Sequence, residues 1–164
     1  MKVFHARSEG KPSDLRSETF TGTVWADPIM PVTDGVMIGN VFFSPGGRTH
    51  WHSHERGQVL TVIAGSGWIC KDGEKPQRII TGDFVWIAPD ERHWHGADAG
   101  TYMIHTATTL GKTSWAEAVS EADYLKSRVP PARYFSRMNC PLPPAAHYTF
   151  SRIAVARRNR RLEA

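Results

Sequence analysis

The stretch GRTHWHSHERGQ, from Gly47 to Gln58, decides the fold of this chain and most of its chemistry. It places His52 and His54 two residues apart, and alternate side chains of a β-strand point to the same face. Gln58 keeps that parity beyond a turn at residues 55–57. The stretch therefore predicts a strand, a turn and a second strand that present two imidazoles and a carboxamide on one wall.

A second stretch, GDFVWIAPDERH from Gly82 to His93, complements the first. Both stretches have glycine-bounded turns, and the second supplies one more histidine from a neighbouring strand. Neutral imidazoles together with a carboxamide oxygen are a ligand set suited to a divalent transition metal. We therefore predict a metal site formed by His52, His54, Gln58 and His93.

The segment from residue 20 to about 109 predicts an all-β fold. It alternates short runs of β-branched and aromatic residues with turns rich in Gly, Pro and Asp. The runs are residues 20–25, 36–43, 49–54, 58–63, 65–71, 78–81, 83–87, 93–97 and 102–108. Many short strands at close spacing, without helical patterns between them, are typical of a sandwich or barrel. We place turns at the corners, including one at residues 65–67.

The two ends of the chain differ from this central segment. Residues 1–19 are polar and predict an arm with little structure of its own. Capping patterns at 114–117 and 120–123 predict two short helices that pack on the barrel. Residues 128–164 are rich in Pro and Arg and predict a basic, poorly ordered tail. The predicted organisation is an arm, one domain over 20–127 and a tail that the chemistry does not need.

The net charge of +4 over 164 residues is unevenly distributed. Residues 1–124 hold 11 basic and 15 acidic residues, whereas residues 125–164 hold 9 and 1. The basicity lies in the tail, so it does not indicate that the barrel binds nucleic acid, and a nucleic-acid partner is not expected. No stretch has the roughly 18 apolar residues of a membrane span, and no signal-peptide pattern begins the chain. We expect a cytoplasmic protein with no membrane partner.

Two further histidines are candidates for catalysis. His95 follows His93 by two residues and shares its face, and His105 has inward parity on the next strand. A neutral imidazole beside a metal-bound substrate can act as a general acid or base, because its pKa lies near the working pH. The alternative for each is a core histidine bonded to a backbone carbonyl. Apolar positions on the barrel strands predict a narrow pocket for a small substrate, such as an aromatic one. The predicted pocket residues are Gly39, Val41 and Leu60.

These motifs resemble those of small single-domain cupins over roughly residues 20–124. The matching phrases are FTGTV at 20–24, WHSH at 51–54, GQ at 57–58, GW at 67–68, GDFVW at 82–86 and HWHGA at 93–97. The branch is often described as carboxymuconolactone-decarboxylase-associated, and it includes bacterial manganese-dependent hydroxynitrile lyases. The resemblance implies a single jelly-roll-like cupin barrel and a small-molecule substrate. It also implies that a metal on the four predicted ligands binds a cyanohydrin, which is split into an aldehyde and cyanide, with His95 and His105 in the pocket.

The glutamine ligand bears on which metal chemistry to expect. Many cupins have a glutamate where this chain has Gln58, and a neutral ligand leaves the full charge on the metal. Such a site attracts anions and acidifies a bound hydroxyl, so we predict Lewis-acid chemistry rather than oxidation with dioxygen. The alternative is that Gln58 does not ligate and a water replaces it. The oxygen ligand and the absence of thiolates favour Mn or Fe, with Zn, Ni and Co as alternatives.

Three functions remain open from the sequence. The first is a metal-dependent lyase of hydroxynitrile-lyase type. The second is an iron-dependent dioxygenase of an aromatic or phenolic substrate, and the third is a non-catalytic cupin that binds a small molecule. Edge-strand character up to Trp25 also predicts a homodimer, or a higher homo-oligomer, that buries the arm.

Overall fold

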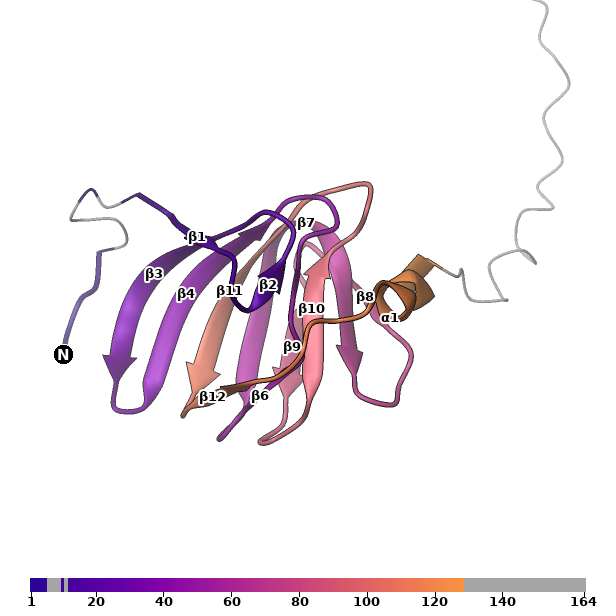
Figure 1. The fold of residues 1–164 in the computed structure, drawn as a ribbon. Helices are drawn as coiled ribbons and strands as arrows, with labels where there is room; N and C mark the ends of the chain where they lie inside the picture. The colour runs from indigo at the N-terminus through magenta and orange to yellow at the C-terminus, as the bar shows by residue number, and fades with distance from the viewer. Residues whose placement is uncertain (6–9, 11, 129–164) are drawn as a thin grey trace, which may run out of the picture. The chain divides into compact units, whose positions relative to one another are not determined.

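The computed structural model describes residues 1–5, 10 and 12–128 (Figure 1). These residues lie within one compact unit, Met1–Pro130. The predicted basic tail, 128–164, lies outside the described residues except for Arg128. Among the described residues, no helix is long and apolar enough to cross a membrane.

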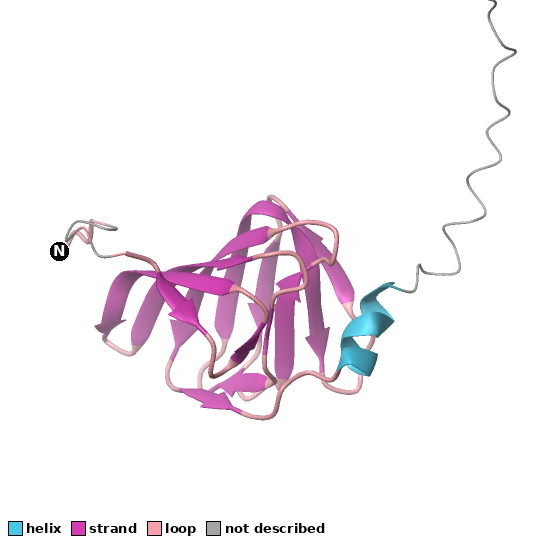
Figure 2. Ribbon diagram, turned by 45° about the horizontal axis from the view of Figure 1, so that its top comes forward, coloured by secondary structure: helices cyan, strands magenta, loops and turns pink. Residues whose placement is uncertain are grey.

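The described residues form a nearly closed antiparallel β-barrel, as the sequence predicts (Figures 1 and 2). The main path of hydrogen-bonded strands runs β1-β3-β4-β11-β7-β10-β5-β2. Strands β8 and β9 pair with β7, while β6 pairs with β10 and β12. The strands are β1 (Asp14–Arg16), β2 (Phe20–Thr21), β3 (Val24–Thr33), β4 (Val36–Phe43), β5 (Arg48–Thr49), β6 (His52–His54), β7 (Gln58–Lys71), β8 (Gln77–Ile80), β9 (Phe84–Ile87), β10 (His93–Ala97), β11 (Met103–Leu110) and β12 (Thr113–Trp115).

Strand β7 joins two runs that the sequence separates, so the turn expected at 65–67 is wrong. Gly65 has φ +76°, and a Cβ there would lie 2.0 Å from the carbonyl oxygen of Tyr102. The neighbouring strand β11 shifts register between Ile104 and His105, opposite this part of β7. A glycine at positive φ inside a strand marks a bulge as readily as a turn. Here it bends one long strand that serves both halves of the barrel.

The N-terminal arm is more ordered than its composition predicts. Strand β1 pairs antiparallel with β3, in the register Asp14 with Ala26 and Arg16 with Val24. Beyond that pairing, β3 continues to Thr33 through two prolines, with register shifts against β4. Proline lacks the N–H of a sheet ladder and is tolerated at edges and bulges. The arm therefore contributes an edge strand that extends the barrel.

The first of the two predicted helices is absent, because residues 113–115 form β12. Pairing with β6 satisfies the backbone there and overrides the local capping pattern. The second cap is confirmed: Ser120 Oγ accepts from the Asp123 N–H at 3.0 Å and begins α1 (Glu121–Leu125). A 3₁₀ turn, η1 (Lys126–Arg128), follows it. Figure 2 shows this helix at one end of the strands.

Two groups of buried residues form the core. The larger fills the barrel and includes Phe43, Leu60 and Met103, each fully buried. The smaller packs Tyr124 of α1 with buried residues of the barrel such as Trp94. The histidines described next are buried beside the larger group, so the barrel excludes water from most of their surface.

Candidate metal centre

Three strands bring five histidines into one region of the barrel interior. Strand β6 supplies His52 and His54, β10 supplies His93 and His95, and β11 supplies His105. His93 is the register partner of His52, and their ring centroids lie 4.1 Å apart. The centroids of His52 and His54 are 5.0 Å apart, and those of His95 and His105 are 4.8 Å apart. All five residues are at least 97% buried.

Backbone carbonyls hold two of these rings by their outer nitrogens. His52 Nδ1 lies 2.9 Å from the His50 oxygen, and His93 Nδ1 lies 2.8 Å from the Glu91 oxygen. A carbonyl oxygen only accepts, so each Nδ1 carries the proton and donates. The tautomer is thereby fixed, and Nε2 of each ring keeps its lone pair. Metal-binding histidines are oriented by this kind of contact.

Threonine hydroxyls hold the next two side chains. His54 Nδ1 lies 3.1 Å from Thr113 Oγ1, and the Gln58 amide nitrogen donates to Thr109 Oγ1 at 2.9 Å. These contacts leave His54 Nε2 and Gln58 Oε1 free to bind elsewhere. Both threonines come from the strands that follow the second motif, β11 and β12. The spacing of the two sequence motifs does not predict either threonine.

The inner atoms of this group are buried without hydrogen-bond partners. They are His54 Nε2, Gln58 Oε1, His93 Nε2 and His95 Nε2, counted among the described residues. An unpaired buried polar atom costs about 1–3 kcal/mol, so several in one place call for a shared partner. One ligand atom from each of His52, His93 and His95 lies within 4.8 Å of the others. Nitrogen lone pairs and a carboxamide oxygen fit a divalent metal ion.

Burial keeps these imidazoles neutral. Burial lowers the pKa of His93. It lowers the pKa values of His52 and His95 well below the usual value, and neighbouring histidines add to the effect for these two. Burial also lowers the pKa of His54 to about 4. A metal ligand must be unprotonated, so at neutral pH the protein does not have to release protons to bind an ion.

The predicted ligand set and the tightest histidine cluster overlap without being identical. The cluster contains His95, which the sequence analysis assigns to catalysis, and does not contain His54. His95 differs from the others in its outer partner, because its Nδ1 lies 3.2 Å from His105 Nε2 instead of a carbonyl or hydroxyl oxygen. A histidine whose outer nitrogen contacts a second histidine has a route for its proton that His52 and His93 lack, because a carbonyl oxygen only accepts.

A cavity of about 320 Å³ opens beside the histidines. Of the predicted pocket residues, Gly39 and Val41 line it, but Leu60 does not. Leu60 is fully buried and packs in the hydrophobic core, so the alternation of side chains along the strand was insufficient to tell a core position from a cavity position. The cavity wall is mostly apolar, and its polar residues include most of the histidine group. The lining histidines and glutamine are His52, His54, Gln58, His95 and His105.

Comparison with known proteins fits this architecture. The family profile of the Cupin domain matches residues 39–104. An (R)-mandelonitrile lyase of Granulicella tundricola is 42% identical over 131 residues, which cover 76% of this chain and 97% of that protein. The chain belongs to the cupin family. Because this relative is matched over nearly its whole length, it also indicates that the cupin described here is an enzyme of the lyase class.

Solved cupin structures share the barrel. A cupin-like protein from Thermotoga maritima superposes with a TM-score of 0.67 at 32% identity, covering 77% of this chain and 97% of that one. A polyketide cyclase from Streptomyces resistomycificus superposes at 0.58 with 19% identity, covering 79% and 94%. The second similarity concerns the fold alone. In a cupin barrel, the three-histidine cluster indicates a divalent metal.

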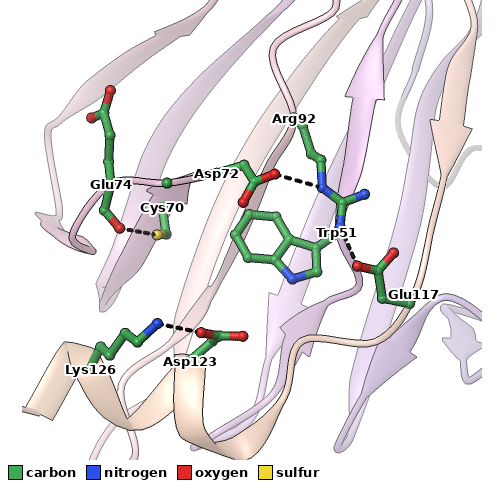
Figure 3. A pocket seen from close by; sticks show the side chains of 9 residues that line it. Trp51, Cys70, Asp72, Glu74, Arg92, Glu117, Asp123 and Lys126 are labelled. Atoms are coloured by element: carbon green, nitrogen blue, oxygen red, sulfur yellow. Dashed lines mark hydrogen bonds and ion pairs between the residues drawn. The ribbon is translucent and has the colours of Figure 1, made fainter.

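The lining of a second pocket contains none of the predicted ligands (Figure 3). Most of its charged side chains are paired with each other. Arg92 contacts Asp72 at 3.2 Å and also Glu117, and Lys126 contacts Asp123 at 2.6 Å. Burial raises the pKa of the Cys70 thiol at its edge to about 11, so this cysteine is not a nucleophile at neutral pH.

Proposed function

We propose that this cupin is a metal-dependent hydroxynitrile lyase, which splits a cyanohydrin into an aldehyde and hydrogen cyanide. The supporting observation is the set of inward-facing unpaired atoms beside a mostly apolar cavity, together with the similarity to an (R)-mandelonitrile lyase. We assign the metal to His52, His54, Gln58 and His93. When bound, the ion supplies Lewis acidity that lowers the pKa of a coordinated hydroxyl group.

His95 is the proposed base. Its Nε2 is unpartnered among the described residues, and its Nδ1 contacts His105. For Nε2 to accept a proton, Nδ1 must carry one, and this proton is donated to His105 Nε2. His95 then takes the proton of the cyanohydrin hydroxyl. The oxygen forms the aldehyde C=O as the C–C bond breaks, and the electron pair leaves with cyanide.

The same histidine can complete the cycle. Burial lowers the pKa of His95 well below the usual value, so the protonated ring readily gives up its proton. That proton goes to the departing cyanide, and hydrogen cyanide leaves with His95 restored to its neutral form. The cavity favours a substrate with an apolar body, because side chains such as Met30, Ile38 and Ala107 line it. An aromatic cyanohydrin has that shape and chemistry.

Manganese is the proposed ion. A shell of three imidazoles and one carboxamide oxygen has no thiolate, which disfavours soft metals, and it has no negative charge to support a higher oxidation state. Each feature favours a site that polarises a hydroxyl without changing its own redox state. Iron, zinc, nickel and cobalt are competing ions for the same atoms.

The test combines metal analysis with turnover. Protein reloaded with Mn²⁺ should release benzaldehyde from mandelonitrile at the same rate in air and under nitrogen. Dioxygen uptake that tracks turnover would instead identify a dioxygenase. A metal-loaded protein that is inert towards cyanohydrins, with or without dioxygen, would contradict the lyase assignment.

A further inference from the structure

Strand β12 runs beside the strand that carries two of the proposed metal ligands. It pairs antiparallel with β6 (Figure 1). The register sets Thr113 opposite His54 and Trp115 opposite His52. Each β12 side chain that acts on the centre therefore sits across from one particular histidine. Ser114, between them, is exposed and points to the other face.

Backbone hydrogen bonds extend this pairing past both ends of β12. The Glu55 N–H donates to the Lys112 oxygen at 2.9 Å, and the Trp51 N–H donates to the Glu117 oxygen at 3.0 Å. Glu55 also accepts from the Lys112 N–H through its side chain at 3.0 Å. The two strands are thus fixed over a longer stretch than their three paired residues, and small displacements of β12 are resisted.

Thr113 acts on His54 through a hydrogen bond. The Nδ1–Oγ1 distance is 3.1 Å, and the inner nitrogen of the same ring is buried and unpaired. When Nε2 keeps its lone pair, Nδ1 donates to the hydroxyl, so Thr113 selects the tautomer that can bind a metal. Without that partner, the ring is free to rotate or to protonate on the wrong nitrogen.

Trp115 acts on His52 through ring stacking. The centroids are 4.6 Å apart with an interplanar angle of 30°. The indole also contacts Phe20 of β2, with a centroid distance of 5.5 Å. Trp115 is 42% exposed, so it is not simply a core residue. The His52 ring is therefore held by two contacts: the His50 carbonyl oxygen at its Nδ1 edge and the Trp115 indole against its face.

We propose that β12 is the positioning strand of the metal centre, with Thr113 fixing the tautomer of His54 and Trp115 fixing the ring plane of His52. The proposal rests on the proposed metal site and concerns how that site is oriented, whatever the substrate. Outer contacts of this kind commonly change metal affinity about 10- to 100-fold when removed. Both side chains are positioning residues, because they act through the histidines.

The experiment measures Co²⁺ and Mn²⁺ binding to the full-length apo-protein, with the visible spectrum of bound Co²⁺ as a report of coordination geometry. Thr113→Val keeps the shape but removes the hydroxyl, and Thr113→Ser restores a hydroxyl. Ser114→Ala is the matched control on the same strand. We expect Thr113→Val to weaken Co²⁺ binding about 10- to 100-fold and alter the spectrum. Thr113→Ser should recover most of the affinity, and Ser114→Ala should match the wild type.

Trp115 provides an independent arm if Thr113→Val folds poorly. Trp115→Leu keeps apolar bulk without a stacking ring, whereas Trp115→Phe keeps a smaller ring. The leucine variant should bind Co²⁺ more weakly than the phenylalanine variant, at comparable melting temperatures of the apo-proteins. If β12 had only a structural role, these substitutions would lower the melting temperatures, and the folded variants would bind Co²⁺ with equal affinity.

The outcomes separate this proposal from the proposed function. Wild-type protein that binds neither ion overturns the metal site and the role of β12 together. Wild-type protein that binds Co²⁺, with Thr113→Val and Trp115→Leu equal to it in affinity and spectrum, overturns only the role of β12. Loss of affinity that Thr113→Ser does not restore also counts against the hydrogen bond.

Discussion

His105 Nε2 lies 3.2 Å from His95 Nδ1, and this contact separates His95 from the other inward-facing histidines. The outer nitrogens of His52 and His93 are held by backbone carbonyls, which cannot exchange protons. An imidazole can both donate and accept, so the pair can change protonation together. The same cavity thus contains rings suited to hold an ion and one ring suited to move a proton.

The first prediction separates these roles by substitution. His95→Ala should keep metal content near the wild-type value while lowering kcat for mandelonitrile by about 100-fold or more, the usual contribution of a general base. His54→Ala should instead reduce metal content itself. Metal analysis and steady-state kinetics on both variants give the answer. If His95→Ala loses its metal and His54→Ala keeps it, His95 is a ligand and the assignment of the two must be exchanged.

A second prediction concerns the charge of the ligand shell. Gln58→Glu should retain the metal, since a carboxylate binds divalent ions well, but should lower the rate of cyanohydrin cleavage because the added charge weakens the Lewis acidity of the ion. Rates under nitrogen, normalised to metal content, are the measurement. Gln77→Glu, an exposed site on β8, makes the same chemical change away from the cavity and should have no effect. An equal or faster rate in Gln58→Glu would refute the electrostatic argument.

Sequence periodicity predicted which side chains share a face, and the structure shows where this reasoning ends. Parity placed His52, His54 and Gln58 on one wall, and the cavity lining contains all three. Parity could not give depth, so Leu60 was expected in the pocket although it packs in the core. Local signals could not reveal that β12 pairs with a strand about 60 residues earlier, because that pairing depends on closure of the barrel.

The third prediction concerns Arg48, which ties α1 to the barrel. Its guanidinium lies 4.4 Å from the centre of the Tyr124 ring, and Nη2 contacts Glu121 at 3.0 Å. The Arg48 side chain is 8% exposed and that of Glu121 is 63% exposed. Arg48→Ala should therefore lower the free energy of unfolding by about 1–3 kcal/mol, through lost stacking and buried hydrogen bonds.

Glu121→Gln is the matched control for Arg48. It removes only the exposed charge, and exposed ion pairs contribute about 0–1 kcal/mol. Urea unfolding of both variants, with metal content measured alongside, tests the difference. Equal destabilisation by the two changes would show that the ion pair matters and the stacking on Tyr124 does not. Loss of metal in Arg48→Ala would link α1 to the centre, which we do not expect.

A fourth prediction is that the chain forms a homodimer through the edge at β1. Strand β1 ends the path of paired strands, and its Leu15 side chain is 58% exposed. Further along the neighbouring strand β3, beyond its pairing with β1, Val32 is 71% exposed. Unprotected edges of this kind readily pair with a second chain. Light scattering at micromolar concentration should give twice the chain mass of 18.3 kDa. Leu15→Lys should favour the monomer, whereas Ile80→Lys, on β8, should not. A wild-type monomer would remove the basis for this prediction.

The fifth prediction concerns the acid stability of the apo-protein. Burial lowers the pKa of His105 from 6.5 to about 4. Between pH 4 and 6.5, His105 is therefore protonated in the unfolded chain and neutral in the folded chain. This contribution to stability is complete above pH 6.5 and is lost as the pH falls towards 4, by about 3 kcal/mol in total. His105→Gln cannot take up the proton and should show a flatter dependence of unfolding free energy on pH. Urea unfolding between pH 4 and 7 measures this dependence, and His5→Gln, at an exposed histidine, is the control. Parallel curves for His105→Gln and the wild type would contradict the prediction, because His105 would then be protonated as easily in the folded chain as in the unfolded one.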